Sequence, residues 1–233
     1  MPAPLPPDEA ARLEALRKYD ILDSAPDAFF DDLVLLASTI TGSPIAAFTL
    51  IDAERQWFKA SQGLADKETT RDEAFCAYTI LGDDLMVVPD ATRDLRFAEN
   101  RFVVKDPGIR FYAGAPVRSR EGLNLGSICV IDRQPRRSLL EHQRLALKAI
   151  ACQASALLEL RRTAAELAGA LRDFRTLSRL LPICSNCRRI RDGENAWHTA
   201  EEALQQSGAQ FSSALCPDCL RMHYPEYADG RGR

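Results

Sequence analysis

Hydrophobic and polar positions at the start of the chain predict two helices. Asp8 stands where a helix-capping residue is expected. Behind it, Leu13, Leu16 and Ile21 recur among acidic and basic residues at helical spacing. A second helical pattern covers residues 23–42 and ends in a glycine, the residue most often found where a helix stops. The chain is therefore expected to begin with two helices.

Runs of β-prone residues follow these helices. The runs at 45–51 and 56–60 flank a short polar turn and predict a hairpin. A short apolar run at 85–88 predicts one buried strand, and two runs within 111–132, separated by a Glu-Gly turn, predict a second hairpin. Because helices do not alternate regularly with these strands, the expected fold class is α+β with a central antiparallel sheet.

Two segments between the strands are less regular. Residues 71–80 predict a short helix. Residues 94–110 are polar and rich in turn formers, and they carry three arginines of the kind usually found on surfaces: Arg96, Arg101 and Arg110. We expect this segment to connect the strand at 85–88 to the second hairpin.

The longest uninterrupted helical pattern runs from residue 139 to 180, with no proline and one glycine. Its apolar residues recur at alternating three- and four-residue spacings, as in the seam of a coiled coil. This seam indicates a homodimer, although a helix packed on its own domain would show similar periodicity in its first half. Seven of the eight seam positions are apolar, and the set is Ile150, Gln153, Leu157, Leu160, Ala164, Leu167, Leu171 and Phe174.

Composition narrows the class of protein. With 46% hydrophobic and 27% charged residues, the 233-residue chain has enough apolar material for a sizeable core. Its net charge of −3 argues against a chain built mainly to neutralise phosphates. No run approaches the roughly 18 apolar residues of a membrane span, and the first residues carry prolines and acids where a signal peptide would be apolar. We expect a cytoplasmic protein whose cysteines are reduced, metal-bound or buried.

Two CxxC pairs near the C-terminus carry the strongest chemical signal. Cys184 and Cys187 form the first pair, and Cys216 and Cys219 form the second after a 28-residue spacer. Four thiolates satisfy tetrahedral zinc and leave no open position, so the pattern predicts a structural zinc site. A thiol–disulfide switch remains an alternative. Attachment of c-type haem would require a histidine directly after the second cysteine of a pair, and neither pair has one.

The spacer between the pairs has its own pattern. Residues 196–208 predict a helix that stops at Gly208, and residues 210–215 predict a short extended piece. Pro217, inside the second pair, is placed to open a helix over 220–224. His198 and His223 lie near the pairs in sequence, but with four cysteines present they are expected outside the metal's ligand shell.

The three other cysteines are expected to be small buried hydrophobic residues, with a thiol sensor as the alternative for the first of them. They are Cys76, Cys129 and Cys152. An enzyme that reduces methionine sulfoxide would need two or three of them to converge in one pocket.

Several blocks between residues 8 and 160 resemble those of bacterial GAF sensor domains, in the subgroup upstream of histidine kinases and diguanylate cyclases. The blocks are RLEALRKYDILDSAPDAFFDDLVLLA, SPIAAFTLIDAERQWFKASQGL, RDEAFCAYTI, VVPDATRDLRFAENRFV, IRFYAGAPV and LGSICVIDRQPR. The resemblance implies a central antiparallel sheet flanked by helices, with a ligand pocket between one sheet face and the connecting segments. The chain departs from the family where Arg101 and Phe102 stand in place of a frequent Pro-Leu.

The resemblance also implies which residues face the pocket. Aromatic rings with a few convergent cations would suit a small planar or anionic ligand, whereas core packing and surface arginines explain the same residues without a ligand. Bilin attachment is not expected, because neither Cys76 nor Cys129 has an adjacent histidine. The implied ligand-binding residues are Trp57, Phe58, Lys59, Phe75, Cys76, Arg96, Phe97 and Arg110.

The C-terminal segment is similar to a short cysteine-paired module attached to many bacterial sensor proteins. The expected organisation is a GAF sensor domain at 1–138, a long coiled-coil helix at 139–181, a zinc module at 182–227 and a flexible tail at 228–233. We expect a non-catalytic regulator in which the GAF domain binds a small ligand or partner and the zinc module contacts a downstream signalling protein.

A nucleic-acid-binding regulator is a further alternative. Arg188, Arg189 and Arg191 form a cluster beside the first pair, which would suit phosphates. Against it, residues 182–233 hold six Lys or Arg and seven Asp or Glu, so no basic face is implied.

Overall fold

The computed structural model describes residues 1–177, 180–191, 196–199 and 210–227. These residues form two compact units, Met1–Ala164 and Ala165–Arg233. Within the described ranges, no helix is long and apolar enough to cross a membrane.

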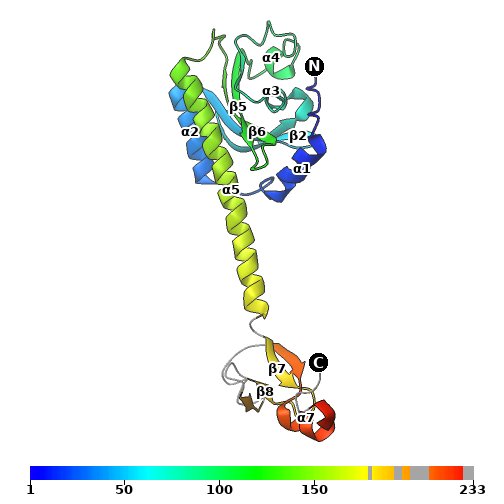
Figure 1. The fold of residues 1–233 in the computed structure, drawn as a ribbon. Helices are drawn as coiled ribbons and strands as arrows, with labels where there is room; N and C mark the ends of the chain where they lie inside the picture. Colours follow the sequence, from blue (N-terminus) through cyan, green and yellow to red (C-terminus); the bar gives the residue numbers. More distant parts are fainter. Residues whose placement is uncertain (178–179, 192–195, 200–209, 228–233) are drawn as a thin grey trace. The chain divides into compact units, whose positions relative to one another are not determined.

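The first unit is built on a six-stranded antiparallel sheet (Figure 1). Its strand order is β3-β2-β1-β6-β5-β4. The predicted α+β class with a central antiparallel sheet is therefore confirmed, and the two predicted hairpins are β1–β2 and β5–β6. The strands are β1 (Ile45–Ile51), β2 (Arg55–Gln62), β3 (Glu68–Thr70), β4 (Met86–Val88), β5 (Phe111–Arg118) and β6 (Asn124–Asp132).

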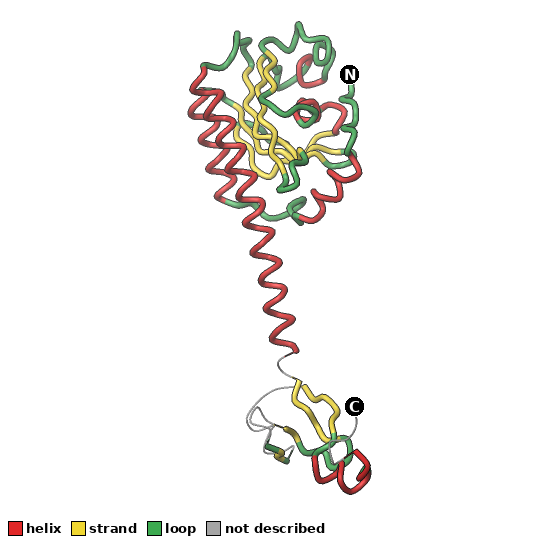
Figure 2. The backbone as a smooth tube through the Cα atoms, in the orientation of Figure 1, coloured by secondary structure: helices red, strands yellow, loops and turns green. Residues whose placement is uncertain are grey.

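Helices cover both faces of this sheet (Figure 2). α1 (Glu9–Lys18), α2 (Ala28–Thr41) and the first part of α5 (Glu141–Leu177) pack on one face. The short helices α3 (Phe75–Thr79) and α4 (Arg101–Val104), with the 3₁₀ turn η1 (Arg71–Glu73), lie on the other. All seven residues of β1 are buried, because alternate side chains of a strand point to opposite faces and both faces are covered.

Local sequence signals explain how the helices begin and end. Asp27 caps α2 by accepting a hydrogen bond from the backbone N of Phe29, and Gly42 ends the helix with a left-handed φ of 59°. Asp8 stands at the start of α1 but makes no side-chain capping bond. The predicted connector holds α4, which Asn100 caps by accepting from the backbone N of Phe102 at 2.9 Å.

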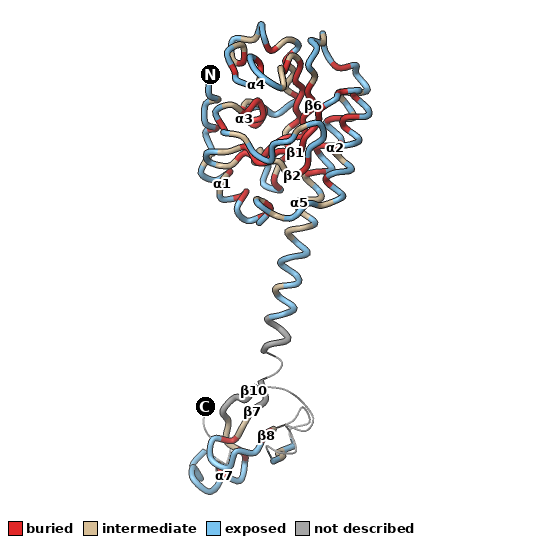
Figure 3. The backbone as a smooth tube through the Cα atoms, turned by 180° about the vertical axis from the view of Figure 1, so that it is seen from behind, coloured by how far each residue is buried: buried red, intermediate tan, exposed pale blue. Residues whose placement is uncertain are grey.

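The long helix α5 changes character along its length. Ile150, Ala154 and Leu158 are buried against the sheet, whereas Leu160 and Leu167 are 65% and 60% exposed. Figure 3 shows the same change from buried to exposed along the helix. The seam residue Leu171 is also exposed, and the side chain of Phe174 lies outside the described part of the chain. The first half of the seam thus packs on its own domain, and for the exposed second half the coiled-coil pairing stays a prediction.

The second unit contains a four-stranded sheet and a short helix. The strand order is β10-β7-β8-β9, with β10 parallel to β7 and the other pairs antiparallel. The strands are β7 (Leu180–Cys184), β8 (Ile190–Arg191), β9 (Trp197–His198) and β10 (Gln210–Ala214), followed by α7 (Pro217–His223) and the 3₁₀ turn η2 (Pro225–Tyr227). The predicted extended piece is β10, and Pro217 begins α7 as its position predicted.

The helix predicted over residues 196–208 does not begin where we expected it. Trp197 and His198 form β9 and pair with Arg191 and Ile190. The guanidinium of Arg191 lies 5.8 Å from the centroid of the Trp197 ring, and this contact together with the strand preference of tryptophan favours pairing over helix. The rest of that prediction, and the flexible tail at 228–233, fall outside the described residues.

Candidate ligand pocket and candidate metal centre

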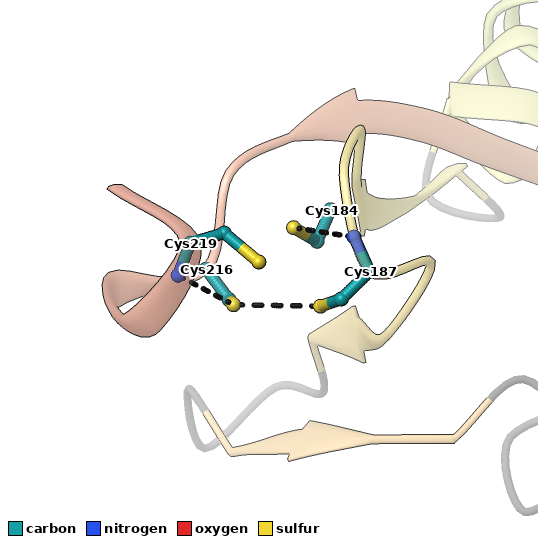
Figure 4. Close-up of side chains that lie close together, drawn as sticks. All are labelled: Cys184, Cys187, Cys216 and Cys219. Atoms are coloured by element: carbon teal, nitrogen blue, oxygen red, sulfur yellow. Dashed lines mark hydrogen bonds between the residues drawn. The ribbon is translucent and has the colours of Figure 1, made fainter. Parts of the chain in front are cut away.

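The four cysteines of the two CxxC pairs come together in the second unit (Figure 4). Cys184 ends β7 and Cys187 lies in the turn before β8, while Cys216 caps α7 and Cys219 lies in its first turn. Their Sγ atoms all lie within 4.8 Å of one another. The sheet and α7 thus bring together two pairs that are 28 residues apart in sequence.

Backbone and side-chain N–H groups surround these sulfurs. The backbone N of Cys187 donates to Cys184 Sγ at 3.4 Å, and that of Cys219 donates to Cys216 Sγ at 3.5 Å. Asn186 Nδ2 donates to Cys219 Sγ at 3.3 Å. Burial raises the pKa of Cys184, but hydrogen bonds from the backbone N–H groups of Cys187, Cys216 and Asn186 outweigh it and lower the pKa to about 6. Such donors favour the thiolate, which is the metal-binding form.

The arrangement fits a tetrahedral metal ion. A metal bound at about 2.3 Å by four sulfurs would place them about 3.8 Å apart, and Cys187 Sγ and Cys216 Sγ lie 3.5 Å apart. Among the described residues, the potential ligands that gather here are the four cysteines, so this cluster could hold a metal ion. His198 lies in β9 and His223 ends α7, and neither belongs to the cluster.

The first unit contains a cavity of about 60 Å³ between the sheet and α3, which has room for several waters or a small ligand. Its wall combines apolar side chains with a few polar groups. The lining residues are Ala47, Gln56, Phe58, Leu64, Asp66, Thr69, Glu73, Ala74, Phe75, Cys76, Phe102, Pro107, Ile109, Tyr112, Cys129 and Ile131.

Two polar atoms of this wall have no hydrogen-bond partner among the described residues. They are Gln56 Oε1 and Thr69 Oγ1, both buried, and the whole Gln56 residue is 7% exposed. Leaving a buried polar atom unpaired costs on the order of 1–3 kcal/mol. The charged residues of the wall are the acids Asp66 and Glu73. The cavity therefore offers an acceptor at Gln56, a hydroxyl at Thr69 that can accept or donate, and negative charge.

Three of the eight predicted ligand-binding residues line this cavity, namely Phe58, Phe75 and Cys76. Trp57 and Lys59 point to the opposite face of the sheet. There Trp57 joins the core beneath the helices, and Lys59 Nζ donates to Ser24 Oγ at 2.9 Å and to the Ala25 carbonyl at 2.5 Å. Burial, and then the charge of Arg161, lowers the pKa of Lys59.

The other three predicted residues lie near the cavity without lining it. Phe97 stacks on Phe75 with ring centroids 3.9 Å apart. Arg96 pairs with Asp94 at 2.7 Å and lies over the Phe97 ring. Arg110 donates to the carbonyl oxygens of Val103 and Ile109. The structure thus keeps Phe58, Phe75 and Phe97 at or beside the cavity, whereas Trp57 lies on the other face of the sheet. The predicted cations contact other partners.

Sequence reasoning missed five polar residues of the wall: Gln56, Asp66, Thr69, Glu73 and Tyr112. A signal for Gln56 was present. Because side chains alternate along a strand, Gln56 and Phe58 share the face opposite Trp57 and Lys59. No comparable signal marks Thr69 or Glu73, which reach the cavity from β3 and η1.

Comparison with known proteins identifies the first unit. The profile of the family described as GAF domain matches residues 25–158. A cyclic di-GMP phosphodiesterase of Pseudomonas aeruginosa is 46% identical over 138 residues, which are 59% of this chain and 24% of that protein. The chain thus spans about a quarter of the length of this relative.

A solved structure shows the same fold at low identity. The bacteriophytochrome RpBphP3 from R. palustris is 15% identical, with a TM-score of 0.53 over 71% of this chain and 39% of that one. The GAF domain of an Acinetobacter phosphoenolpyruvate-protein phosphotransferase is 18% identical, with a TM-score of 0.49 over 67% of this chain and 98% of that one.

Proposed function

This chain belongs to the GAF domain family, and from that premise we propose that it is a non-catalytic sensory regulator of the cytoplasm. Its GAF domain binds a small ligand in the cavity beside α3, and α5 pairs with a second copy. The four-cysteine module holds zinc and contacts a downstream signalling protein. The observation that carries the proposal is the cavity with its unpaired amide oxygen, Gln56 Oε1, and its unpaired hydroxyl, Thr69 Oγ1.

The polar groups of the cavity wall restrict the class of ligand that can bind there. Unpaired oxygen acceptors are satisfied by N–H or O–H donors, and Asp66 and Glu73 disfavour an anion. Phe58 and Phe75 supply aromatic surface. We therefore assign a small neutral or cationic ligand that donates hydrogen bonds; of the planar and anionic ligands that the sequence suggested, this retains the planar one and excludes the anionic one.

Contacts at the edge of the domain support a role for α5 in relaying the ligand-bound state. Ser155 Oγ accepts a hydrogen bond from the backbone N of Arg118 at 2.9 Å. Glu159 accepts from the Tyr19 hydroxyl and from the backbone N of Arg120, the latter at 3.0 Å. These contacts attach α5 to the end of β5, so a change in the sheet acts directly on the helix.

The phosphodiesterase name of the relative raises a catalytic alternative. The similarity covers 138 residues and about a quarter of that enzyme, so we propose that the shared stretch is a regulatory GAF domain. Incubating the purified chain with cyclic di-GMP and a divalent metal ion tests this directly. The proposal predicts no turnover, and hydrolysis at an enzymatic rate would overturn it.

The ligand is tested by extracting small molecules from the purified protein. The wild-type chain is denatured with acid, and the released compounds are identified by mass spectrometry. The Gln56→Leu variant removes a cavity acceptor, while Gln62→Leu changes an exposed position of the same strand. The proposal predicts a compound released from wild type and from Gln62→Leu but reduced at least tenfold in Gln56→Leu. Equal release from all three proteins, or from none, contradicts it.

A further inference from the structure

Two cysteines lie side by side in the core of the GAF domain. Cys76, on α3, and Cys129, on β6, are 53 residues apart in sequence, yet their Sγ atoms are 3.7 Å apart. Both residues are buried, with exposures of 2% and 1%. Both residues also line the cavity beside α3, so a small molecule in that space would lie next to the pair.

Hydroxyl groups surround this pair in an otherwise apolar core. The Tyr112 hydroxyl donates to Cys76 Sγ at 3.3 Å and lies 2.6 Å from Thr79 Oγ1. Gly114 leaves the room for this arrangement, since a Cβ at that position would lie 2.2 Å from the Tyr112 hydroxyl oxygen. A buried sulfur that serves only for packing requires none of these donors.

The environment makes the two thiols unequal. Burial raises the pKa of Cys76, but hydrogen bonds from Cys129, Ser127, Thr49 and Tyr112 outweigh it and lower the pKa to about 7. The pKa of Cys129 is raised, first by its hydrogen bond to Cys76 and then by burial. Cys76 is therefore the more acidic thiol of the two and Cys129 the less acidic, the inequality expected of an attacking and a resolving cysteine.

We propose that Cys76 and Cys129 are a redox-reactive pair, which hydrogen peroxide entering the cavity converts to a disulfide inside the GAF domain. The Cys76 thiolate attacks one oxygen of the peroxide, the O–O bond breaks, and the other oxygen leaves as hydroxide, which takes a proton to become water. Cys76 is then a sulfenic acid. The Cys129 sulfur, losing its proton, attacks the Cys76 sulfur, the S–O bond breaks, and the oxygen leaves as a second water. Two thiols lose two electrons and one peroxide gains them.

This chemistry adds an oxidant input that is separate from the ligand proposed above. Forming the bond draws the sulfurs from 3.7 Å to about 2.05 Å, and because Cys129 is fixed in the central strand β6, α3 must move or its side chains must reorient. Phe75, next to Cys76 on α3, lines the cavity. Oxidation would therefore change the shape of the cavity wall.

The test is peptide mapping of the full chain. Reduced protein with zinc present is exposed to a few equivalents of hydrogen peroxide, free thiols are alkylated under denaturing conditions, and trypsin releases Cys76 in peptide 72–93 and Cys129 in peptide 121–133. The proposal predicts that these two peptides become linked, with the loss of two hydrogens, and that a reductant separates them. If Cys76 and Cys129 were both still alkylated, and so unoxidised, at a peroxide dose that oxidises the exposed Cys152, the proposal would be overturned.

Variants separate the two steps. Cys129→Ser removes the second cysteine, so Cys76 should accumulate as a sulfenic acid that dimedone traps. Cys152→Ser is the matched control and should form the linked peptides at the wild-type rate. Tyr112→Phe removes a donor to Cys76 and should slow linkage several-fold without preventing it. Equal rates in the native chain and in urea would show that the fold does not promote the reaction, which also contradicts the proposal.

Discussion

Cys187 Sγ lies 3.5 Å from Cys216 Sγ, and this contact joins the two CxxC pairs across the C-terminal unit. Among the described residues, the buried cluster of this unit consists of three of the cysteines with Trp197 and Leu215 packed against them. So small an apolar cluster contributes little stability, and we infer that a metal ion supplies most of the folding free energy of the unit.

Replacing one cysteine should therefore unfold this unit alone. Zinc binding in small modules is worth about 10–16 kcal/mol, so Cys216→Ser or a strong chelator should abolish the melting transition of the C-terminal unit. The GAF domain should keep its own transition in calorimetry. Cys152→Ser, at an exposed position, is the control and should leave both transitions in place. Loss of both transitions together in Cys216→Ser would refute independent folding.

The exposed half of the α5 seam predicts a dimer. Leu160 and Leu167 are mostly exposed in a single chain, and a charge placed between paired helices would be buried without a partner. Leu160→Asp and Leu167→Asp should each shift the protein toward monomer in sedimentation, raising the dimer dissociation constant at least tenfold. Ala165→Asp introduces the same charge on the other side of the helix and should leave the dimer intact. An unchanged mass for the two leucine variants would contradict pairing through this seam.

Glu9 makes the stability of the GAF domain sensitive to acid. Burial raises the pKa of Glu9, but hydrogen bonds from Arg12 and Arg71, followed by their charges, lower it to about 2 from 4.5. A carboxylate with a depressed folded pKa stabilises the protein above its unfolded pKa, and this contribution is lost as pH falls through the folded pKa. Between pH 5 and 2, the free energy of unfolding of the domain should therefore decrease by on the order of 3 kcal/mol from this group.

The Glu9→Gln variant should remove this dependence of stability on pH. Arg12 and Arg71 are 1% and 6% exposed, so Glu9→Gln leaves two buried guanidinium groups without their carboxylate and should cost about 3–5 kcal/mol at pH 7. Urea titrations of wild type and variant at pH 7 and pH 3 measure both effects. Glu14→Gln, at an exposed site of α1, is the control. If Glu9→Gln retained the wild-type loss of stability on acidification, this explanation would be wrong.

Gly114, in β5, should not tolerate replacement by a residue with a side chain. A Cβ there would lie 2.2 Å from the Tyr112 hydroxyl oxygen and 2.9 Å from Thr79 Oγ1. Overpacking of this kind costs about 1–3 kcal/mol, so Gly114→Ala should lower the melting temperature of the GAF transition by several degrees. Gly82→Ala, where a Cβ meets nothing within 4 Å, should change it little. Equal melting temperatures for the two variants would contradict the packing described here.

The elements that sequence predicted well are those whose signals are local. Gly42 marks the end of α2 through its left-handed φ, and the alternation and length of the β1 and β2 runs predict a hairpin without knowledge of the rest of the fold. The spacing of the cysteine pairs alone likewise predicts a four-sulfur cluster. Such features depend on a few neighbouring residues, so the chain itself contains the information.

The residues that line the cavity were harder to predict, because they come from segments that are distant in sequence. Three consecutive residues, Trp57 to Lys59, were expected at one pocket, although a strand sends them alternately to opposite faces. Cys152 was expected to be buried, but it lies on the exposed side of α5. Ile150 and Ala154, one helical turn apart, occupy the side of the helix that packs on the core, and Cys152 faces away from that side. Tertiary packing decides which element covers each face of a strand or helix, and the local sequence does not contain that information.

Native mass spectrometry of protein purified without added metal measures the zinc content and the oligomeric state in one experiment. We expect a species of twice the chain mass that carries two zinc ions, because each chain supplies four sulfurs and α5 pairs two chains. Extra mass beyond the metal would reveal the bound ligand. A metal-free monomer, lighter than the reduced chain by four hydrogens, would contain two disulfides and would contradict both the zinc site and the dimer.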